Sequence, residues 1–483
     1  MLKKFLLISL FALFSSLGFA KEVSYSIDIN SVEKKINGNN VSLFSLKNSL
    51  AVPIIKLDLG SITKEQNPVI KANLGDTLKV TFNNKTEEEI TIHWHGVLLP
   101  NEMDGVSLLT QLPITPGESF TYVFEVKQTG TYWYHAHDLT EAQGVFGGIV
   151  FGDKNEDISN ENVLLYSGVL PKNPAEVLAD LTGRDINNMM HENHEVSDSQ
   201  DSDEKDEGMN HKMVRNANMN HFSDVSYIAN YINGSEAPLK IVDIKNGKVK
   251  LRIVNAYADG YLNFVYSGGK FTVIAADGIN VKPLTVDHLR VAMGETYDII
   301  LEVKDKSKSY ELVSFLLGGE SYSKVIVGKG PLVPLESYNY NDYSLNQVYA
   351  DLQSITPKFI NFDKFKKVNN HEFSLVGDHM SYTWKIQENG ADLSNMDLKV
   401  GDKVKVKITN NTMMPHPMHL HGHFFKVNLP KSSNNLIKHT INLDPRESLE
   451  FEFVVDAEGK WLYHCHNLFH MASGMMITLN VSK

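Results

Sequence analysis

The 483-residue sequence contains a single cysteine, so no disulfide can form within the chain. Lysine and arginine number 46 against 58 aspartates and glutamates, which leaves a formal net charge of −12. This balance disfavours nucleic-acid binding, because a phosphate-binding surface needs clustered basic side chains. No long amphipathic helical pattern is present, and the one apolar run near the N-terminus is too short to span a bilayer.

The first 20 residues have the pattern of a cleavable signal peptide. Lys3 and Lys4 form a charged start, residues 5–14 are apolar, and residues 18–20 form a small-residue cleavage site. No twin arginine precedes the apolar run, which favours general secretion over export of a folded protein. We therefore expect a periplasmic protein without stable membrane insertion, whose single thiol is buried or metal-bound.

After the signal peptide, short apolar stretches alternate with Gly, Asn and Asp turns, which is typical of an all-β sandwich protein. One pattern occurs three times, and each copy joins a glycine-led strand to a second strand that follows a turn with glutamate. The glycine-led strands are residues 75–84, 247–256 and 401–410, and the turns with the second strands that follow them are 116–125, 293–302 and 445–453. Three copies predict three domains of one kind, at residues 21–155, 156–340 and 341–483.

Histidines follow the repeat strands of the first and third copies as four His-x-His pairs. The pairs are His93 with His95, His135 with His137, His419 with His421, and His464 with His466. Side chains two positions apart on a strand share one face, so each pair presents two imidazoles together. The middle copy has no histidine at the corresponding places, residues 262–265 and 311–314. Imidazoles from two domains can converge only at an interdomain surface, which predicts a polynuclear metal site between domains one and three.

The only cysteine, Cys465, lies between His464 and His466. On a strand it points away from the face that its two neighbours share, so one tripeptide can serve a metal site on each side. His470 follows five residues after the cysteine, and Met475 follows five residues after that. A thiolate, an imidazole and a weak thioether are the ligands of a copper electron-transfer site. The pattern therefore predicts a mononuclear copper site beside the polynuclear one.

Residues 187–221, the Met/His-rich segment, have almost no aliphatic side chains. The surrounding stretch from Asp185 to Asp224 has ten acidic against three basic residues, a net charge of −7. We expect this segment to be loosely ordered, and its thioethers and imidazoles to capture copper. The alternative is a solvated polar insertion without a role. The candidate substrate-copper ligands in the segment are Met189, Met190, His191, His194, Met209, His211, Met213, Met219 and His221.

With these motifs the chain resembles the multicopper oxidases, and within them the bacterial copper resistance protein A branch. The resemblance rests on the four histidine pairs with Cys465, and on residues 275–281, 411–422 and 463–471. It covers the whole mature chain and implies three consecutive cupredoxin-like Greek-key β-sandwich domains. It also implies four copper ions, which couple one-electron oxidations at a type 1 copper to the reduction of O2 to water.

The resemblance also implies a role for each ligand. The type 1 copper would be held by His416, Cys465, His470 and an axial Met475, the type 2 copper by His93 and His419, and the type 3 pair by His95, His135 and His466 on one copper and His137, His421 and His464 on the other. Asp104, which follows the first histidine pair, has the position at which the family places an acid that supplies protons. An ordinary turn aspartate before glycine is the alternative interpretation of Asp104.

The chain departs from the family pattern at two positions near the type 1 ligands. Many members have an acid directly after the second type 1 histidine, where this chain has Met471. Some cuprous oxidases have an acid four residues before the first type 1 histidine, where this chain has Thr412. Met413, Met414 and Met471 are further candidate ligands for substrate copper, although core packing is the commoner use of methionine.

We expect the chain to be a monomeric oxidase that converts Cu(I) to Cu(II) with O2 and so confers copper tolerance. Laccase-type oxidation of phenols and oxidation of Fe(II) are alternatives, because an exposed type 1 site accepts many small organic or metal reductants. The Met/His-rich segment favours Cu(I), whereas an open aromatic pocket over His416 and His470 would favour phenols. A copper-binding protein without turnover is less well supported, because a type 1 site has no use without an acceptor cluster.

Overall fold

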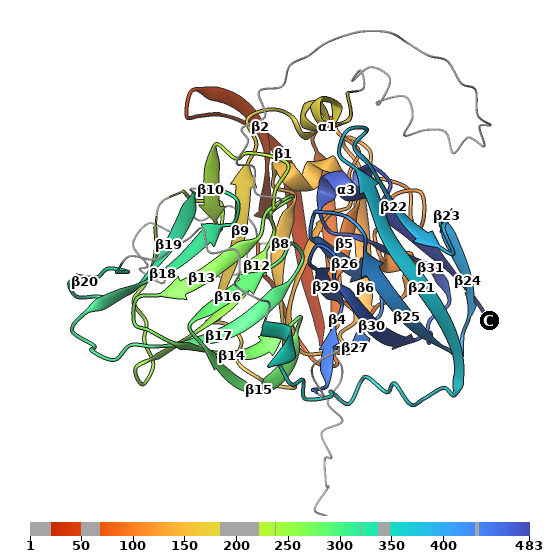
Figure 1. Ribbon diagram of the computed structural model, residues 1–483. Helices are drawn as coiled ribbons and strands as arrows, with labels where there is room; N and C mark the ends of the chain where they lie inside the picture. Colours follow the sequence, from red (N-terminus) through yellow and green to blue (C-terminus); the bar gives the residue numbers. More distant parts are fainter. Residues whose placement is uncertain are drawn as a thin grey trace, which may run out of the picture.

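The computed structural model describes most of the chain. The described residues are 21–49, 68–183, 222–236, 238–319, 321–336, 348–429 and 434–483. The predicted signal peptide and the Met/His-rich segment lie outside these ranges. The described chain forms six β-sheets, arranged as three sandwiches that follow one another along the sequence (Figure 1). No helix in these ranges is long and apolar enough to cross a membrane.

The first sandwich has one sheet in the order β2-β1-β4-β6 and one in the order β3-β8-β7-β5. Its strands are β1 (Glu22–Ile36), β2 (Asn39–Asn48), β3 (Ile70–Asn73), β4 (Thr77–Lys85), β5 (Ile92–His95), β6 (Ser119–Glu125), β7 (Gly130–Ala136) and β8 (Phe146–Gly152). Two short 3-10 helices follow the strands that carry histidine: η1 (Asn101–Met103) comes after β5, and η2 (Leu139–Gln143) comes after β7.

The second sandwich has sheets in the orders β10-β9-β12-β17-β14-β15 and β11-β19-β18-β13-β16, with β20 paired to β18. Its strands are β9 (Asn162–Val169), β10 (Ala229–Ile232), β11 (Leu239–Ile241), β12 (Lys248–Asn255), β13 (Leu262–Tyr266), β14 (Phe271–Ala276), β15 (Ile279–Val286), β16 (His288–Val291), β17 (Thr296–Glu302), β18 (Ser309–Leu316), β19 (Tyr322–Gly328) and β20 (Leu332–Val333). One α-helix, α1 (Pro174–Thr182), follows β9 and is capped by the Asn173 side chain.

The third sandwich has sheets in the orders β23-β22-β21-β25-β30-β27-β28 and β24-β32-β31-β26-β29. Its strands are β21 (Lys367–Asp378), β22 (Thr383–Glu388), β23 (Ala391–Asp392), β24 (Asn395–Lys399), β25 (Asp402–Asn410), β26 (His416–Leu420), β27 (Phe425–Asn428), β28 (Leu436–Lys438), β29 (Thr440–Leu443), β30 (Ser448–Val454), β31 (Gly459–Cys465) and β32 (Met476–Ser482). The 3-10 helix η3 (Val348–Ala350) precedes the sandwich, and the short helix α3 (Leu468–Ala472) follows β31.

The sequence repeat corresponds to the same pair of strands in each sandwich. The glycine-led strands β4, β12 and β25 pair antiparallel with the second strands β6, β17 and β30. Each glycine-led strand also pairs in parallel with the first strand of its sandwich. Burial alternates along β4 and β25, because one face of each strand packs into the core. The threefold repeat is confirmed, and the domain limits after residues 155 and 340 stay a proposal.

Equivalent strand pairs in the three sandwiches carry or lack the histidines. β5 pairs with β7 in the first sandwich, and β26 pairs with β31 in the third. In the second sandwich β13 pairs with β18, and Leu262 and Phe264 of β13 are buried in the core instead. β5 and β26 lie side by side at the centre of Figure 1, and the rings of His95 and His419 stack with centroids 3.7 Å apart. The histidine-bearing strands of the first and third sandwiches therefore face each other.

Candidate metal centre

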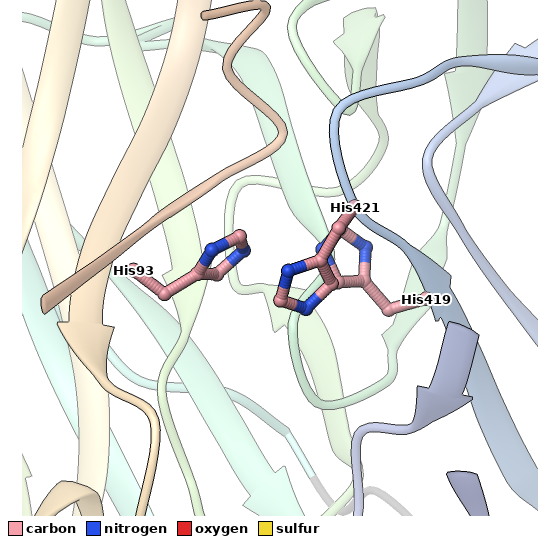
Figure 2. A group of neighbouring side chains, drawn as sticks. All are labelled: His93, His419 and His421. Atoms are coloured by element: carbon pink, nitrogen blue, oxygen red, sulfur yellow. The ribbon is translucent and has the colours of Figure 1, made fainter. Parts of the chain in front are cut away.

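The four histidine pairs meet at the interface between the first and third sandwiches. Within the first sandwich His93 lies directly opposite His135 on the neighbouring strand, and within the third His419 lies opposite His464. Figure 2 shows His93 facing His419 and His421 across the interface. The rings of His93 and His421 stack with centroids 3.8 Å apart. The structure thus brings together the histidines for which the sequence predicted a shared site.

The ring nitrogens of this cluster form groups that could each hold a metal ion. The groups whose ligand atoms lie within 4.8 Å of one another include His93-His419-His421, His93-His95-His135, His95-His419-His439 and His137-His421-His464. His466 belongs to the same cluster, because its ring centroid lies 4.8 Å from that of His95 and 5.2 Å from that of His135. All eight paired histidines and one further histidine, His439, are therefore collected in one buried cluster.

The inner nitrogens of the cluster fit a bound metal. The buried imidazole nitrogens without a hydrogen-bond partner in the described part of the chain include His93 Nε2, His95 Nδ1, His135 Nε2, His419 Nε2 and His466 Nε2. An unpartnered buried polar group costs about 1–3 kcal/mol, so five together are unfavourable unless a metal satisfies them. His421 Nε2 and His137 Nε2 lie 3.0 and 3.4 Å from His464 Nε2, which is the approach expected of imidazoles that share one ion.

Asp104 is fully buried beside the cluster and contacts ligands from both sandwiches. Its backbone oxygen accepts a hydrogen bond from His93 Nδ1, and its Oδ2 accepts one from His421 Nδ1, each at 2.8 Å. The next residue, Gly105, has a φ of 81°, and a Cβ there would overlap the Ile92 carbonyl of β5. Glycine is therefore required for the loop to press against β5. The loop and the two hydrogen bonds turn the other ring nitrogen of His93 and of His421 toward the cluster.

Glu141 is a second buried carboxylate at the cluster, and the sequence did not single it out. Its Oε2 lies 2.9 Å from His135 Nδ1, and the residue is 2% exposed. Asp138 places it, because its side chain caps η2 by accepting a hydrogen bond from Thr140 N at 2.7 Å. A carboxylate behind an imidazole orients the ring and raises its basicity as a ligand. No motif marks this glutamate, because its contact with His135 depends on the turn between them.

Burial determines the protonation of the cluster. Desolvation, together with repulsion from neighbouring imidazoles, lowers the pKa well below 6.5 for His95, His137, His419, His421 and His466. Burial likewise lowers the pKa of His464 to about 3. These rings are therefore neutral at pH 7, and the neutral imidazole is the form that binds metal ions.

The single cysteine forms a separate group with two histidines, called the cysteine group: His416, Cys465 and His470. Cys465 Sγ lies 3.7 Å from His416 Nδ1 and 3.8 Å from His470 Nδ1, and the two nitrogens are 3.0 Å apart. All three residues are fully buried, as is Met475, whose backbone oxygen accepts a hydrogen bond from Cys465 N at 3.0 Å. Burial raises the pKa of the Cys465 thiol above its usual range, so the thiolate needs a cation beside it.

The position of His470 is set by the cap of a short helix. Asn467 Oδ1 accepts hydrogen bonds from Phe469 N at 3.0 Å and from His470 N at 3.3 Å, which starts α3 directly after the His-Cys-His tripeptide. The His470 ring then packs on Trp384, with centroids 4.1 Å apart. The five-residue spacing between Cys465 and His470 thus becomes a reversal that returns the imidazole to the sulfur.

The outer nitrogens of these two histidines have different partners. His416 Nε2 lies 2.7 Å from the hydroxyl of Thr412. His470 Nε2 lies 2.9 Å from Asp224 Oδ2, which also accepts a hydrogen bond from Tyr382 Oη at 2.7 Å. Burial raises the pKa of Asp224, but the hydrogen bond and the charge interaction with His470 lower it further, to below its ordinary value. Asp224 is thus a carboxylate, and no motif in the sequence marks it as part of the site.

The methionines proposed as ligands for substrate copper differ in burial. Met414 and Met471 are 2% and 8% exposed and pack in the hydrophobic core, the alternative given for them above. Met413 is 48% exposed, with its sulfur 3.6 Å from Arg446 Nη2. Burial therefore leaves only Met413 of the three in contact with solvent. The candidates between Met189 and His221 lie outside the described residues.

Three sequence models described as multicopper oxidase match the chain at residues 64–156, 186–324 and 365–483. The three matches fall on the three sandwiches in turn. The chain belongs to the multicopper oxidase family. Membership means that the protein is an oxidoreductase with copper as its cofactor, in the form of one type 1, one type 2 and two type 3 ions, and with O2 as acceptor.

Two named proteins are similar to this chain over most of its length. Copper resistance protein A of Escherichia coli is 28% identical over 86% of this chain and 88% of its own length. Multicopper oxidase MmcO of Mycobacterium tuberculosis is 27% identical over 86% of this chain and 81% of its own length.

Two solved structures show the same fold. Fet3p, a multicopper oxidase that functions in iron import, has a TM-score of 0.71 at 18% identity and covers 96% of this chain and 91% of its own. A multicopper oxidase from Campylobacter jejuni, titled a metallo-oxidase, has a TM-score of 0.65 at 23% identity and covers 96% and 92%.

Proposed function

We propose that this multicopper oxidase takes Cu(I) as its substrate and converts it to Cu(II). The observation that carries the proposal is the 2.9 Å contact between Asp224 Oδ2 and the outer nitrogen of His470. Asp224 lies three residues after His221, the last residue of the Met/His-rich segment. The segment suited to copper capture therefore leads within three residues to an imidazole of the cysteine group.

The proposed ligand set follows the two groups of side chains. His416, Cys465, His470 and Met475 would hold the type 1 copper, and His93 and His419 would hold the type 2 copper. His95, His135 and His466 would hold one type 3 ion, and His137, His421 and His464 would hold the other. When bound, the four copper ions supply four one-electron oxidations and the reduction of O2 to two water molecules. Burial keeps the rings of His95, His137, His419, His421, His464 and His466 neutral, and Asp104, Glu141 and backbone carbonyls fix the orientation of rings in the cluster.

The surface over the cysteine group supports Cu(I) over Fe(II) and over phenols. His379 Nδ1 lies 3.8 Å from Asp224 Oδ1 in the loop between β21 and β22, and its side chain is 38% exposed. The next residue, Met380, is 78% exposed, and Met413 is 48% exposed. Thioethers and imidazoles are soft ligands that favour Cu(I), whereas hard oxygen ligands would be expected for Fe(II). The negative charge of Asp224 favours a cationic donor.

Asp104 is the proposed source of protons for the reduction of O2. Its Oδ1 is fully buried, lies 3.5 Å from His93 Nδ1 and has no hydrogen-bond partner in the described part of the chain. The residue directly after His470 is Met471, which is packed in the core and has no proton to supply. Asp104 is therefore the carboxylate that contacts ligands of both sandwiches and still has one oxygen free to exchange a proton.

We also infer that the protein works in the periplasm. The inference rests on the signal-peptide pattern of residues 1–20. Similarity to proteins named copper resistance protein A supports a role in copper tolerance.

The test of Cu(I) as substrate is the substitution Asp224→Asn, which keeps the shape of the side chain and removes its charge. The amide oxygen can still accept hydrogen bonds from His470 and Tyr382. The KM for buffered Cu(I) in oxygen uptake should rise about tenfold, which corresponds to about 1.4 kcal/mol of lost attraction. With ferrocyanide, an anionic one-electron donor, the KM should stay the same or fall.

The matched control is Thr412→Val, which removes the hydroxyl behind the other imidazole without changing charge. This variant should leave the KM for Cu(I) within about twofold of the parent protein. Equal changes for Cu(I) and ferrocyanide in Asp224→Asn, or an unchanged KM for Cu(I), would show that the carboxylate does not serve a cationic substrate.

A further inference from the structure

Lys438, at the end of β28, is fully buried together with two carboxylates from the second sandwich. Its Nζ lies 2.8 Å from Glu295 Oε1 and 3.3 Å from Asp277 Oδ1, and both acids are 0% exposed. Breaking one partner out of such a buried group is costly, because the remaining charges lose their compensation. The sandwich without copper ligands thus places two charges next to the third sandwich.

The second oxygen of Asp277 holds the backbone of the turn after Lys438. Asp277 Oδ2 accepts hydrogen bonds from His439 N at 3.2 Å and from Thr440 N at 3.0 Å. Asp277 itself lies at the tip between β14 and β15 with a φ of 48°, and the next residue is Gly278. A Cβ on Gly278 would overlap the ring of Tyr132 in β7, so this tip touches the first sandwich as well.

The same turn holds two imidazoles of the copper cluster. His439 O accepts a hydrogen bond from His419 Nδ1 at 2.8 Å. Thr440 Oγ1 lies 3.1 Å from His95 Nε2 and 3.1 Å from His419 Nδ1. Both rings are thereby fixed with their other nitrogens, His419 Nε2 and His95 Nδ1, directed away from the turn and without partners in the described chain.

We propose that Asp277 is a positioning residue for the type 2 copper. Its carboxylate fixes the backbone of His439 and Thr440, and these two residues fix the rings of His419 and His95. The proposal rests on the assignment of His419 to the type 2 copper given above. The second sandwich would then help to position the site of the type 2 and type 3 copper ions, although it contributes none of the proposed ligands.

Glu295 provides the matched comparison. It is equally buried and lies even closer to Lys438, but its Oε2 accepts a hydrogen bond from Ala292 N, and its Oε1 accepts one from Tyr349 Oη. It has no contact with residues 439–440 among the described hydrogen bonds. A role limited to neutralising Lys438 would therefore belong to both acids, whereas the positioning role belongs to Asp277 alone.

The experiment compares Asp277→Asn with Glu295→Gln in the full-length, copper-loaded protein. Copper per chain and the type 2 signal in electron paramagnetic resonance are followed during titration with a copper chelator. In Asp277→Asn the type 2 ion should bind about 10- to 100-fold more weakly than in the parent protein, as is typical when a contact behind a metal ligand is lost. The type 1 absorption should be unchanged, and Glu295→Gln should hold its type 2 copper within about threefold of the parent protein.

Two further variants separate the possible failures. Thr440→Val keeps the charges but removes the hydroxyl beside His95 and His419, so it should also weaken the binding of the type 2 ion. This variant provides the test if Asp277→Asn does not fold. His419→Ala tests the ligand assignment itself and should abolish the type 2 signal. Retention of the signal in His419→Ala would refute that assignment. Two results would refute the positioning role. One is loss of the type 2 signal in His419→Ala together with full retention of the signal in Asp277→Asn and Thr440→Val. The other is equal weakening of type 2 copper binding in Asp277→Asn and Glu295→Gln.

Discussion

Asp104→Asn is the substitution that separates proton supply from ring orientation at the copper cluster. The amide oxygen can take the place of Oδ2 and accept the hydrogen bond from His421 Nδ1, which is 2.8 Å long in the parent protein. The backbone oxygen of residue 104 still accepts from His93 Nδ1. Orientation of both rings is therefore retained, while the side chain loses its ability to donate and recover a proton.

The size of the effect follows from these contacts. A positioned general acid contributes about 10²- to 10⁴-fold to a rate, so the step that takes up protons should slow at least about 100-fold, or about 2.7 kcal/mol in barrier. The charged hydrogen bond to His421 becomes a neutral one, which costs about 1 kcal/mol of stability. The variant should therefore fold, bind four copper ions and keep the type 1 absorption of the parent protein.

The assay is stopped-flow reoxidation of the fully reduced protein by O2, with Glu141→Gln as the control. Glu141 is the other buried carboxylate at the cluster, 2.9 Å from His135 Nδ1. If Glu141 only orients its ring, Glu141→Gln should reoxidise within about threefold of the parent rate. An unchanged rate in Asp104→Asn, or equal slowing in both variants, would refute the proton role and limit Asp104 to orienting the rings of His93 and His421.

Two further predictions concern the cysteine and the buried histidines. Cys465→Ser should abolish the blue absorption and all turnover while the other three copper ions remain bound, as measured by absorption and metal analysis; retained blue colour would refute the thiolate assignment. The copper-free protein should lose stability as the pH falls from about 6.5 toward 3. The unfolded chain takes up protons near pH 6.5, whereas burial lowers the pKa of His464 to about 3 and that of its neighbours well below 6.5. Each such histidine contributes about 1.4 kcal/mol per pH unit in that window, and a Tm that is flat between pH 7.5 and 5 would contradict it.

The histidine clusters could be predicted because a strand fixes which neighbours share a face. His464 and His466 point to one side of the chain and Cys465 to the other, and the structure places them in two separate groups accordingly. The threefold repeat was equally accessible, because the strands β4, β12 and β25 keep the same apolar alternation and the same leading glycine.

Contacts made by the outer nitrogens could not be predicted in the same way. Asp224, Glu141 and Asp277 are ordinary acids in the sequence, and each acquires its role from a loop or turn that meets a distant strand. No periodicity brings Asp224 to His470 across 246 positions of sequence. The burial of Met414 was equally hidden, because an exposed and a buried methionine stand side by side in residues 413–414.

Oxygen uptake by the copper-loaded protein with Cu(I), Fe(II) and a phenol, measured side by side under the same conditions, tests the proposed function most directly. If Cu(I) is the substrate, kcat/KM should be highest for Cu(I), and four Cu(I) ions should be oxidised for each O2 consumed. A higher kcat/KM for the phenol or for Fe(II), or no uptake of oxygen with Cu(I), would contradict the proposed function.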